Sequence, residues 1–227
     1  MFGNAVVLCA QYCANKALLK MNMDAVKQKS IKYLKAIGVD TPEHLPQIES
    51  LEDVSPRTAQ DIASRLSALA YVIGLAYDAK GQDLLDLLNQ YELLPYVSEY
   101  ERQLLSQTVI DEQDKINISW LVESIQALAW CIGIAGLDHF RCCDDDLASK
   151  IPFKSDPIDF IRNARLRPIH EIQALSDLLY RLHWYVRECA LTKQKCRFDE
   201  SVVSQRRKAI DWAYGVEEHW DDISLDT

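Results

Sequence analysis

Glycine and proline are scarce in this chain, with seven of each among 227 residues. An all-β fold needs frequent turns and draws on both residue types to make them. The scarcity therefore argues against that class and favours helices. No stretch approaches the roughly 18 uninterrupted apolar residues that a membrane-spanning helix needs. Residues 1–8 are mildly apolar but have no basic region before them, which argues against a secretion signal. We therefore expect a cytoplasmic protein that does not contact a membrane.

The familiar signatures of catalysis are also missing. Neither glycine-rich phosphate loop, G-x-x-x-x-G-K-[ST] or G-x-G-x-x-G, is present, and the G-x-S-x-G nucleophile elbow is absent. His170-Glu171 begins like a zinc-protease helix, but Ala174 stands where the second histidine belongs. No histidine has a glutamate three residues before it, so the Glu-x-x-His pairing of di-iron bundles is not encoded.

The seven cysteines form no recognisable disulfide framework, which suggests free thiols in a reducing compartment. The best metal-like cluster is His139, Cys142, Cys143 and Asp144. Structural zinc sites usually present two separated pairs of ligands, and no second pair is evident here. We predict an ordinary loop at this point, without a metal ion or a cofactor. If Cys142 and Cys143 are exposed, they would be sensitive to oxidation.

The net charge of −9 makes a role on the phosphate backbone of nucleic acid improbable. Charge is nevertheless uneven, because residues 165–208 hold ten Lys or Arg against five Asp or Glu. From Asp211 onward there are six carboxylate side chains, no Lys or Arg, and two tryptophans, Trp212 and Trp220. A disordered acidic tail rarely carries tryptophan. We expect the last segment to fold back over the basic region; a basic patch for an anionic partner and an incidental grouping of charge are the alternatives.

Hydrophobic periodicity predicts helices through most of the chain. We expect them at about residues 24–37, from Ser55-Pro56 to near Gly81, and at about 82–94, 99–107, 116–134, 169–191 and 199–214. Ser98 and Glu101 form a capping box, and residues 137–157 are expected to be looped with a short helix near 145–150. The prediction is an all-α fold: a single compact multi-helix domain over residues 27–227 with an ordered acidic C-terminal segment. Residues 1–26 are expected to form a helix or leader outside that domain.

The helix expected at residues 169–191 has two faces that are both suited to packing. One is an ordinary apolar face, whereas Asp177, Arg181 and Trp184 lie on the opposite side. A large indole on a solvated face would expose much apolar surface, so we expect contacts on both sides. Three interpretations follow: a structural ion pair shielded by Trp184, a ligand pocket lined by the three residues, or a surface helix with one stray tryptophan.

Glu123 lies between Trp120 and Trp130 on an otherwise apolar stripe. A buried carboxylate needs a cation or several donors, because an unpaired buried charge is too costly. An arginine is the natural partner, and the sequence alone does not choose among the candidates Arg65, Arg167, Arg181 and Arg207.

Three groups of residues also carry a resemblance to a known family. They are Trp120-x2-Glu123-x6-Trp130, then Leu166-Arg167-x3-Glu171-Ile172-x4-Asp177-x2-Tyr180-Arg181-x2-Trp184, and finally Arg206-Arg207-x4-Trp212 with Trp220-Asp221-Asp222-x3-Asp226-Thr227. Together they resemble domain-of-unknown-function family 4272, a largely bacterial set, over about residues 27–227. The chain departs from that pattern at Gln205, where an acidic residue is expected, and at Asp211, where asparagine is usual. The resemblance implies a helical fold and no established activity.

The candidate pocket or buried ion network comprises Trp120, Glu123, Arg167, Glu171, Asp177, Arg181, Trp184, Arg207, Trp212, Trp220 and Asp221. Three functions remain open. The first is a binding or regulatory protein that acts by surface recognition of a protein partner; in one version, an immunity-like or adaptor role, its carboxylates engage a basic target. The second is an enzyme in which arginine holds an anionic substrate and a carboxylate acts as base, which requires an open cavity and an unpaired carboxylate. The third is a structural or oligomer-forming protein, and the oligomeric state is not encoded in any motif.

Overall fold

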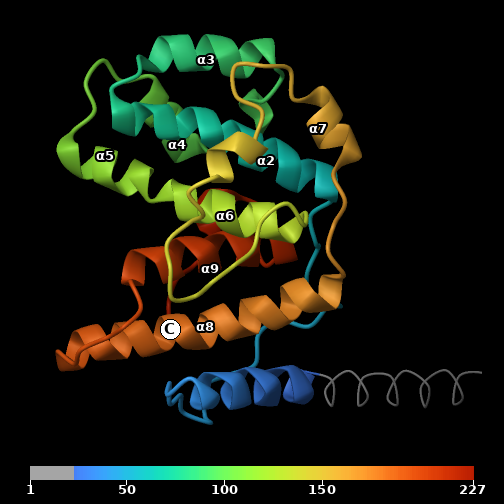
Figure 1. Ribbon diagram of the computed structural model, residues 1–227, viewed down its shortest axis with the longest axis vertical. Coiled ribbons are helices and arrows are strands. Elements are labelled where there is room, and N and C mark those ends of the chain that lie inside the picture. The colour runs from blue at the N-terminus through green and yellow to red at the C-terminus, as the bar shows by residue number, and fades with distance from the viewer. Residues whose placement is uncertain (1–22) are drawn as a thin grey trace, which may run out of the picture.

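The computed structural model describes residues 23–227, and every regular element within them is helical (Figure 1). The all-α prediction is therefore confirmed, while the predicted helix or leader of residues 1–26 lies, up to residue 22, outside the described residues. Residues 23–36 form the first described helix. It is followed by α2 (Ala59–Val72), α3 (Gly81–Gln90), α4 (Glu99–Leu105), α5 (Glu112–Ser119), α6 (Leu121–Cys131), α7 (Ile158–Asn163), α8 (Ile169–Thr192) and α9 (Glu200–Tyr214). Short 3-10 helices are η1 (Ile73–Tyr77), η2 (Leu94–Tyr96), η3 (Leu147–Lys150) and η4 (Trp220–Asp222).

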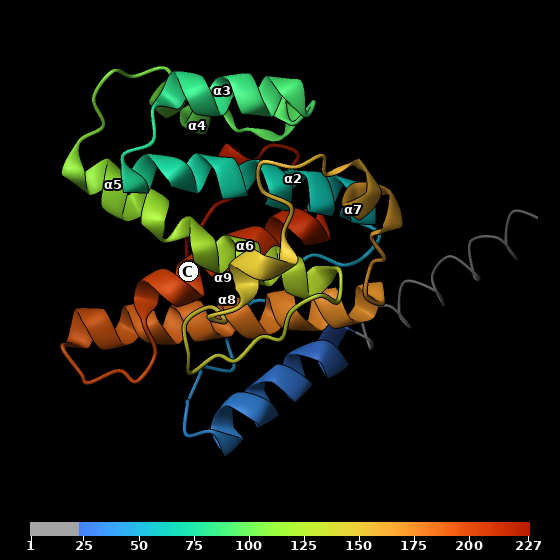
Figure 2. The same ribbon diagram turned by 45° about the horizontal axis from the view of Figure 1, so that its top comes forward.

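The helices are stacked in successive layers (Figures 1 and 2). α3 and α4 lie at one end, followed by α2, then by α6 and α9, and then by α8. The helix of residues 23–36 covers the side of α8 that faces away from α9. α8 therefore packs on both faces, because Leu179 on its apolar face and Asp177 and Arg181 on the opposite face are each at most 1% exposed.

Two apolar clusters hold the layers together. The larger lies where α2, α6, α8 and α9 meet, and one fully buried residue from each helix illustrates it: Leu66, Leu128, Leu179 and Ile210. The smaller lies between the outer face of α2 and helices α3, α4 and α5. Burying apolar surface is the main favourable term in folding. Because α2 contributes to both clusters, it joins the two halves of the domain.

The predicted start of the second helix at Ser55-Pro56 is wrong. α2 begins after Thr58, whose hydroxyl accepts the amide N–H of Asp61 at 3.1 Å in a capping box. The amide of Ser55 donates instead to the carbonyl of Gly215 at 3.2 Å, and that of Arg57 to Ala213 at 3.0 Å. These distant partners hold the segment extended along the end of α9.

A single helix predicted for residues 116–134 is also wrong, because the helix is interrupted at Trp120, between α5 and α6, and α6 ends at Cys131. The hydroxyl of Ser119 donates to the carbonyl of Ile116 at 2.7 Å, a local bond that competes with continuation of the helix. Neither glycine nor proline marks this break. The short helix α7 was not predicted either, whereas the capping box of Ser98 and Glu101 is confirmed at the start of α4.

The C-terminal segment is ordered against the domain, as predicted. α9 ends at Gly215, whose φ of +88° is a left-handed conformation that favours glycine. Trp220 and Ile223 beyond it are each 6% exposed, and the rings of Trp220 and Trp212 meet edge to face at 5.6 Å. Across residues 23–227, the helices are too short or too polar to span a bilayer.

Candidate functional site

The buried charges of residues 23–227 are organised as four ion pairs. Eight acidic or arginine side chains are buried, and each finds its partner within this set. The pairs are Arg65–Glu101, Arg206–Glu123, Arg181–Asp177 and Arg207–Asp211. A buried charge is tolerated only when it is paired and hydrogen-bonded, so these pairs decide which carboxylates remain free for chemistry.

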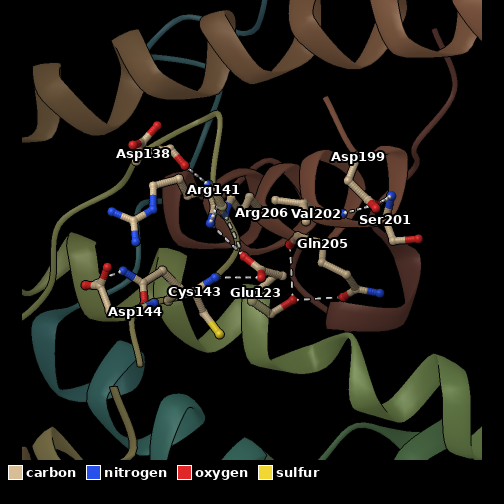
Figure 3. Close-up of polar contacts among 12 residues, drawn as sticks. Glu123, Asp138, Arg141, Cys143, Asp144, Asp199, Ser201, Val202, Gln205 and Arg206 are labelled. Carbon is tan, nitrogen blue, oxygen red and sulfur yellow. Dashed lines mark hydrogen bonds and ion pairs between the residues drawn. The ribbon is translucent and has the colours of Figure 1, made fainter. Parts of the chain in front are cut away.

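Glu123 is held by Arg206 rather than by any of the four arginines proposed from the sequence (Figure 3). Nε and Nη2 of Arg206 lie 2.9 and 2.7 Å from Oε2 of Glu123. Oε1 of Glu123 accepts the amide N–H of Cys143 at 2.8 Å. Both side chains are at most 2% exposed, so solvent does not reach this carboxylate. Glu123 therefore has its charge and its remaining lone pairs satisfied inside the protein.

The same network fixes the loop that follows α6. The guanidinium of Arg206 donates to the backbone carbonyls of Asp138 and Arg141, at 2.5 and 2.9 Å. One turn along α6, the amide of Gln126 donates to Asp144 at 3.0 Å and accepts its N–H at 3.1 Å. Figure 3 shows the side chains of Glu123 from α6 and Arg206 from α9 pointing toward the loop. The buried pair thus positions residues 138–144 instead of lining an open site.

Asp177 and Arg181 form the closed structural pair that one sequence interpretation described. Two bonds of 2.9 and 2.7 Å join them, and Arg181 also donates to the carbonyl of Pro46 at 3.0 Å. Their side chains are 1% and 0% exposed, which leaves no room for a solvent-filled pocket between them. Trp184 is half-buried on the same helix. The pocket interpretation of this face therefore finds no support in the geometry.

Arg207 belongs to a separate chain of hydrogen bonds between α8 and α9. Its Nε donates to Asp211 at 3.2 Å, and Asp211 also accepts the hydroxyl of Ser176 at 2.6 Å. Nη1 of Arg207 lies 2.7 Å from Nδ1 of His183. Because a guanidinium only donates, Nδ1 of His183 must accept. The ring proton is therefore on Nε2, which lies 3.1 Å from the hydroxyl oxygen of Ser204.

Burial shifts the pKa values of Asp211 and His183, the two titratable partners of Arg207. Desolvation raises the pKa of Asp211 to about 6, although Arg207 and the Ser176 hydroxyl oppose the shift. Desolvation, followed by the charges of Arg207 and Arg187, lowers the pKa of His183 to about 4. Asp211 lines a cavity of about 260 Å³ together with Ser176, so an outside molecule can approach this buried carboxylate.

Trp212, Trp220 and Asp221 belong to the region around Arg65. The guanidinium of Arg65 makes two bonds of 2.7 Å to Glu101 and lies 4.1 Å from the centre of the Trp220 ring. Cation–π contact of this kind adds to the attraction of the ion pair. Asp221 is exposed and accepts the amide N–H of Tyr100 at 3.0 Å. The tryptophans here anchor the C-terminal segment.

The remaining sequence candidates lie apart from these clusters. Arg167 and Glu171 form a looser, partly exposed pair at 3.4 Å, and Arg167 donates to the carbonyl of Trp130 at 2.6 Å. Trp120 is half-buried at the junction of α5 and α6. The eleven predicted residues thus do not form a single pocket. Arg206 was missed as a partner although it stands beside Arg207, because a single sequence does not show which side of α9 faces α6.

An acidic groove of about 560 Å³ runs between the start of α4 and the C-terminal segment. Four exposed carboxylates line it, and none of them forms an ion pair within the described residues: Glu99, Glu218, Asp221 and Asp222. The one other cation besides Arg65 in its wall, Arg102, donates to the backbone carbonyls of Val97 and Leu94. The groove therefore has an excess of negative charge.

The metal-like cluster does not assemble. Nowhere in residues 23–227 do three His, Cys, Asp or Glu side chains gather at a spacing suited to a metal ion. Desolvation, followed by the charge of Arg206, lowers the pKa of the mostly buried His139 to about 4. Cys142 is exposed while Cys143 is half-buried, and burial together with Glu123 raises the pKa of Cys143 to about 11. The thiolate of Cys143, the reactive form, is thus disfavoured.

Residues 26–223 match a family model described as "Domain of unknown function (DUF4272)". The match covers nearly all of the chain that the structure describes. Comparisons with curated proteins and with solved structures gave no match.

Proposed function

Because the chain belongs to the DUF4272 family, whose description assigns no activity, we propose its function from geometry: it is a binding protein that recognises a basic protein partner. The partner is bound through the acidic surface, with the acidic groove as the centre of the contact. Opposite charge across an interface steers encounter and selects partners.

The observation that carries the proposal is the division of charge between interior and surface. The described residues hold all 34 acidic side chains and 23 of the 25 basic ones, since Lys16 and Lys20 lie outside them. The four buried pairs remove four of each sign. This leaves 30 acidic against 19 basic side chains outside the buried pairs. The negative charge is therefore presented to solvent, where a basic surface can meet it.

The test compares two variants that lose the same charge. The groove variant replaces Glu99, Glu218, Asp221 and Asp222 by their amides. The control variant replaces four exposed acids elsewhere, Glu43, Asp83, Asp86 and Glu92, by theirs. Each protein is used to capture partners from extracts of its source cells at two salt concentrations.

The proposal expects a stoichiometric basic protein that the wild type and the control retain, that the groove variant loses, and that salt releases. Capture of no stoichiometric partner contradicts the proposal. Equal retention by both variants contradicts the role of the groove.

A second candidate function rests on the cavity beside Asp211. A carboxyl with a pKa of about 6 next to the Ser176 hydroxyl is suited to proton transfer near neutral pH. The cavity has a volume of about 260 Å³ and admits only a small substrate. A thermal-shift screen of nucleotides, metals and small anions tests it, because a ligand that prefers the folded state raises the melting temperature. A shift that Asp211→Asn abolishes supports this candidate, and a flat screen rejects it.

A further inference from the structure

An apolar groove of about 440 Å³ opens on another part of the molecule, where the end of α2, the start of α6 and η3 meet. Its volume lies in the range of about 300–1,000 Å³ that is usual for binding sites. Ala70, Ile73 and Tyr77 form the α2–η1 wall, and the other apolar lining residues come from α6, η3 and the segment after η3. The acidic groove shares none of these residues.

Two aromatic side chains stand exposed at its edge. Tyr77 is 76% exposed and Phe153 is 47% exposed. Phe153 is held in place rather than loose, because its ring packs on Tyr71 at 5.0 Å. The hydroxyl of Tyr71 in turn accepts the amide N–H of Lys154 at 2.9 Å. Exposed aromatic surface on a fixed support is characteristic of a protein interaction site.

The segment leading into η3 is fixed by the buried Glu123–Arg206 network. Glu123 holds the amide of Cys143, and Gln126 exchanges two hydrogen bonds with Asp144. Cys143 and Asp144 both line the groove. The internal ion pair therefore builds one wall of a surface site. A wall that is already in place lowers the entropy lost on binding.

The edge of the groove carries a small excess of acid, because Asp144, Asp145 and Asp146 face Lys150 and also Lys154, whose Nζ lies 5.5 Å from the centre of the Phe153 ring. Asp145 lines it and forms no ion pair with any described residue. Lys150 is shared between Asp144 at 3.9 Å and Asp146 at 2.8 Å, so one cation faces two carboxylates. A basic group on a partner would therefore be attracted to this edge while its apolar neighbours enter the groove.

The α2–η1 wall presents Ala70 from α2 and then Ile73 and Tyr77 from the two ends of η1, so these side chains form a stripe along one continuous helical segment. A stripe of this kind runs along the helix axis and complements the side chains of a second helix. We infer that this groove docks the apolar face of a basic amphipathic helix supplied by a protein partner. The inference deepens the proposed function and rests on it for the sign of the partner's charge.

The probe is a fluorescently labelled helical peptide of leucine and lysine, about 18 residues or five helical turns long. Its leucines form one stripe at helical spacing, and a scrambled peptide of the same composition serves as the control peptide. Binding to the full chain is measured by fluorescence anisotropy. The groove variant is Tyr77→Ser with Phe153→Ser. The matched control is Val109→Ser with Leu191→Ser, which are 80% and 74% exposed and lie outside the groove.

We expect the striped peptide to bind the wild type and the control alike, and the groove variant about tenfold or more weakly, because exposed aromatic anchors dominate such contacts. Asp145→Lys should also weaken binding. Hydrogen exchange should slow at residues 70–77 and 145–153 when the peptide is bound. Circular dichroism and melting of each variant confirm that it is folded.

Equal binding by groove and control variants overturns the inference, as does the absence of binding. If the scrambled peptide binds as tightly as the striped one, and only the acidic-groove variant weakens it, the proposed function stands and this docking site fails. A neutral apolar peptide that binds as well as the basic one overturns the assignment of charge.

Discussion

Arg206 and Glu123 lie 83 positions apart in the chain, and the guanidinium of one contacts a single oxygen of the other at 2.9 and 2.7 Å. The second oxygen of Glu123 accepts the backbone N–H of Cys143. One carboxylate thus joins α6 to α9 and to the loop that precedes η3.

Removing one member of this pair should be strongly destabilising. We expect Glu123→Gln to lower the free energy of unfolding by about 3–5 kcal/mol, because Arg206 is left as an uncompensated buried charge. Urea denaturation measures the loss, and hydrogen exchange should show residues 138–144 opening more often than the rest. Asp78→Asn is the control, since Asp78 is 79% exposed in its pair with Lys115 and should change stability by at most about 1 kcal/mol. Similar losses in the two variants would contradict this account.

The stability of the protein should respond to pH through Asp211. Because burial raises its pKa to about 6, the folded protein holds a proton there between about pH 4 and 6 that the unfolded chain releases. This carboxyl therefore makes folding less favourable as pH rises through that window. His139 and His183, with pKa values lowered to about 4, act in the opposite direction, because the unfolded chain protonates them first.

Asp211→Asn separates these contributions. The variant should gain stability more steeply than the wild type between pH 4 and 6, and the difference between the two curves should change by about 2–3 kcal/mol. Below about pH 6 Asp211 is neutral in the folded wild type as well, so the variant leaves Arg207 without a carboxylate partner only above that pH. Urea titrations at several pH values give the two curves. Parallel curves would show that Asp211 has an ordinary pKa in the folded state.

Local signals in the sequence were sufficient for much of the fold. The capping box of Ser98 and Glu101 marks the start of α4, because the N-cap residue and its partner in the first turn are only three positions apart in the sequence. The two-sided packing of α8 followed from Trp184 and the Asp177–Arg181 pair on one face. In both cases the interacting groups lie within four residues of each other. Helical periodicity then places Trp184 on the same face of α8 as the Asp177–Arg181 pair.

Features that depend on distant partners were not predicted. The segment after Ser55 is extended because Gly215 and Ala213 accept its amide protons, and a proline after serine gives no sign of this. Neighbouring arginines on a helix point about 100° apart. Since α9 lies between α6 and α8, Arg206 meets Glu123 while Arg207 meets His183. Only the crossing of the helices determines that choice.

The C-terminal segment should contribute strongly to stability through one indole. Trp220 is 6% exposed and touches Trp212, Arg65 and Lys208. We expect Trp220→Ala to lower the free energy of unfolding by about 3–5 kcal/mol through lost burial and a new cavity. Trp220→Phe should lower it less, because a ring remains. Thermal and urea unfolding provide the measurement, and a variant as stable as the wild type would show that the segment is not anchored there.

Two glycines with left-handed backbones should respond differently to the same substitution. A Cβ on Gly215 would lie 2.0 Å from the carbonyl oxygen of Ser55, whereas nothing lies within 4 Å of one on Gly133. Gly133→Ala should therefore show only the conformational penalty of about 1–2 kcal/mol. Gly215→Ala adds a steric clash and should lose several times more, measured by urea unfolding. Equal losses would mean that the segment of Ser55 moves aside freely.

Replacing both members of a buried pair by apolar residues should distinguish the two networks. Arg181 has Asp177 and the carbonyl of Pro46 as partners, and its Nη1 finds no acceptor among the described residues. Asp177→Leu with Arg181→Met therefore leaves few groups unsatisfied. It should be at least as stable as the wild type, since such replacements are neutral or stabilising by about 1–4 kcal/mol.

The corresponding change at the other pair, Glu123→Leu with Arg206→Met, should not recover stability. It strands the carbonyls of Asp138 and Arg141 and the amide of Cys143, each of which loses a partner in a partly buried setting. Urea unfolding of the two double variants beside their single variants gives the comparison. Full recovery at both pairs would show that the loop needs no support from Glu123, and the apolar groove would then have to keep its shape without it.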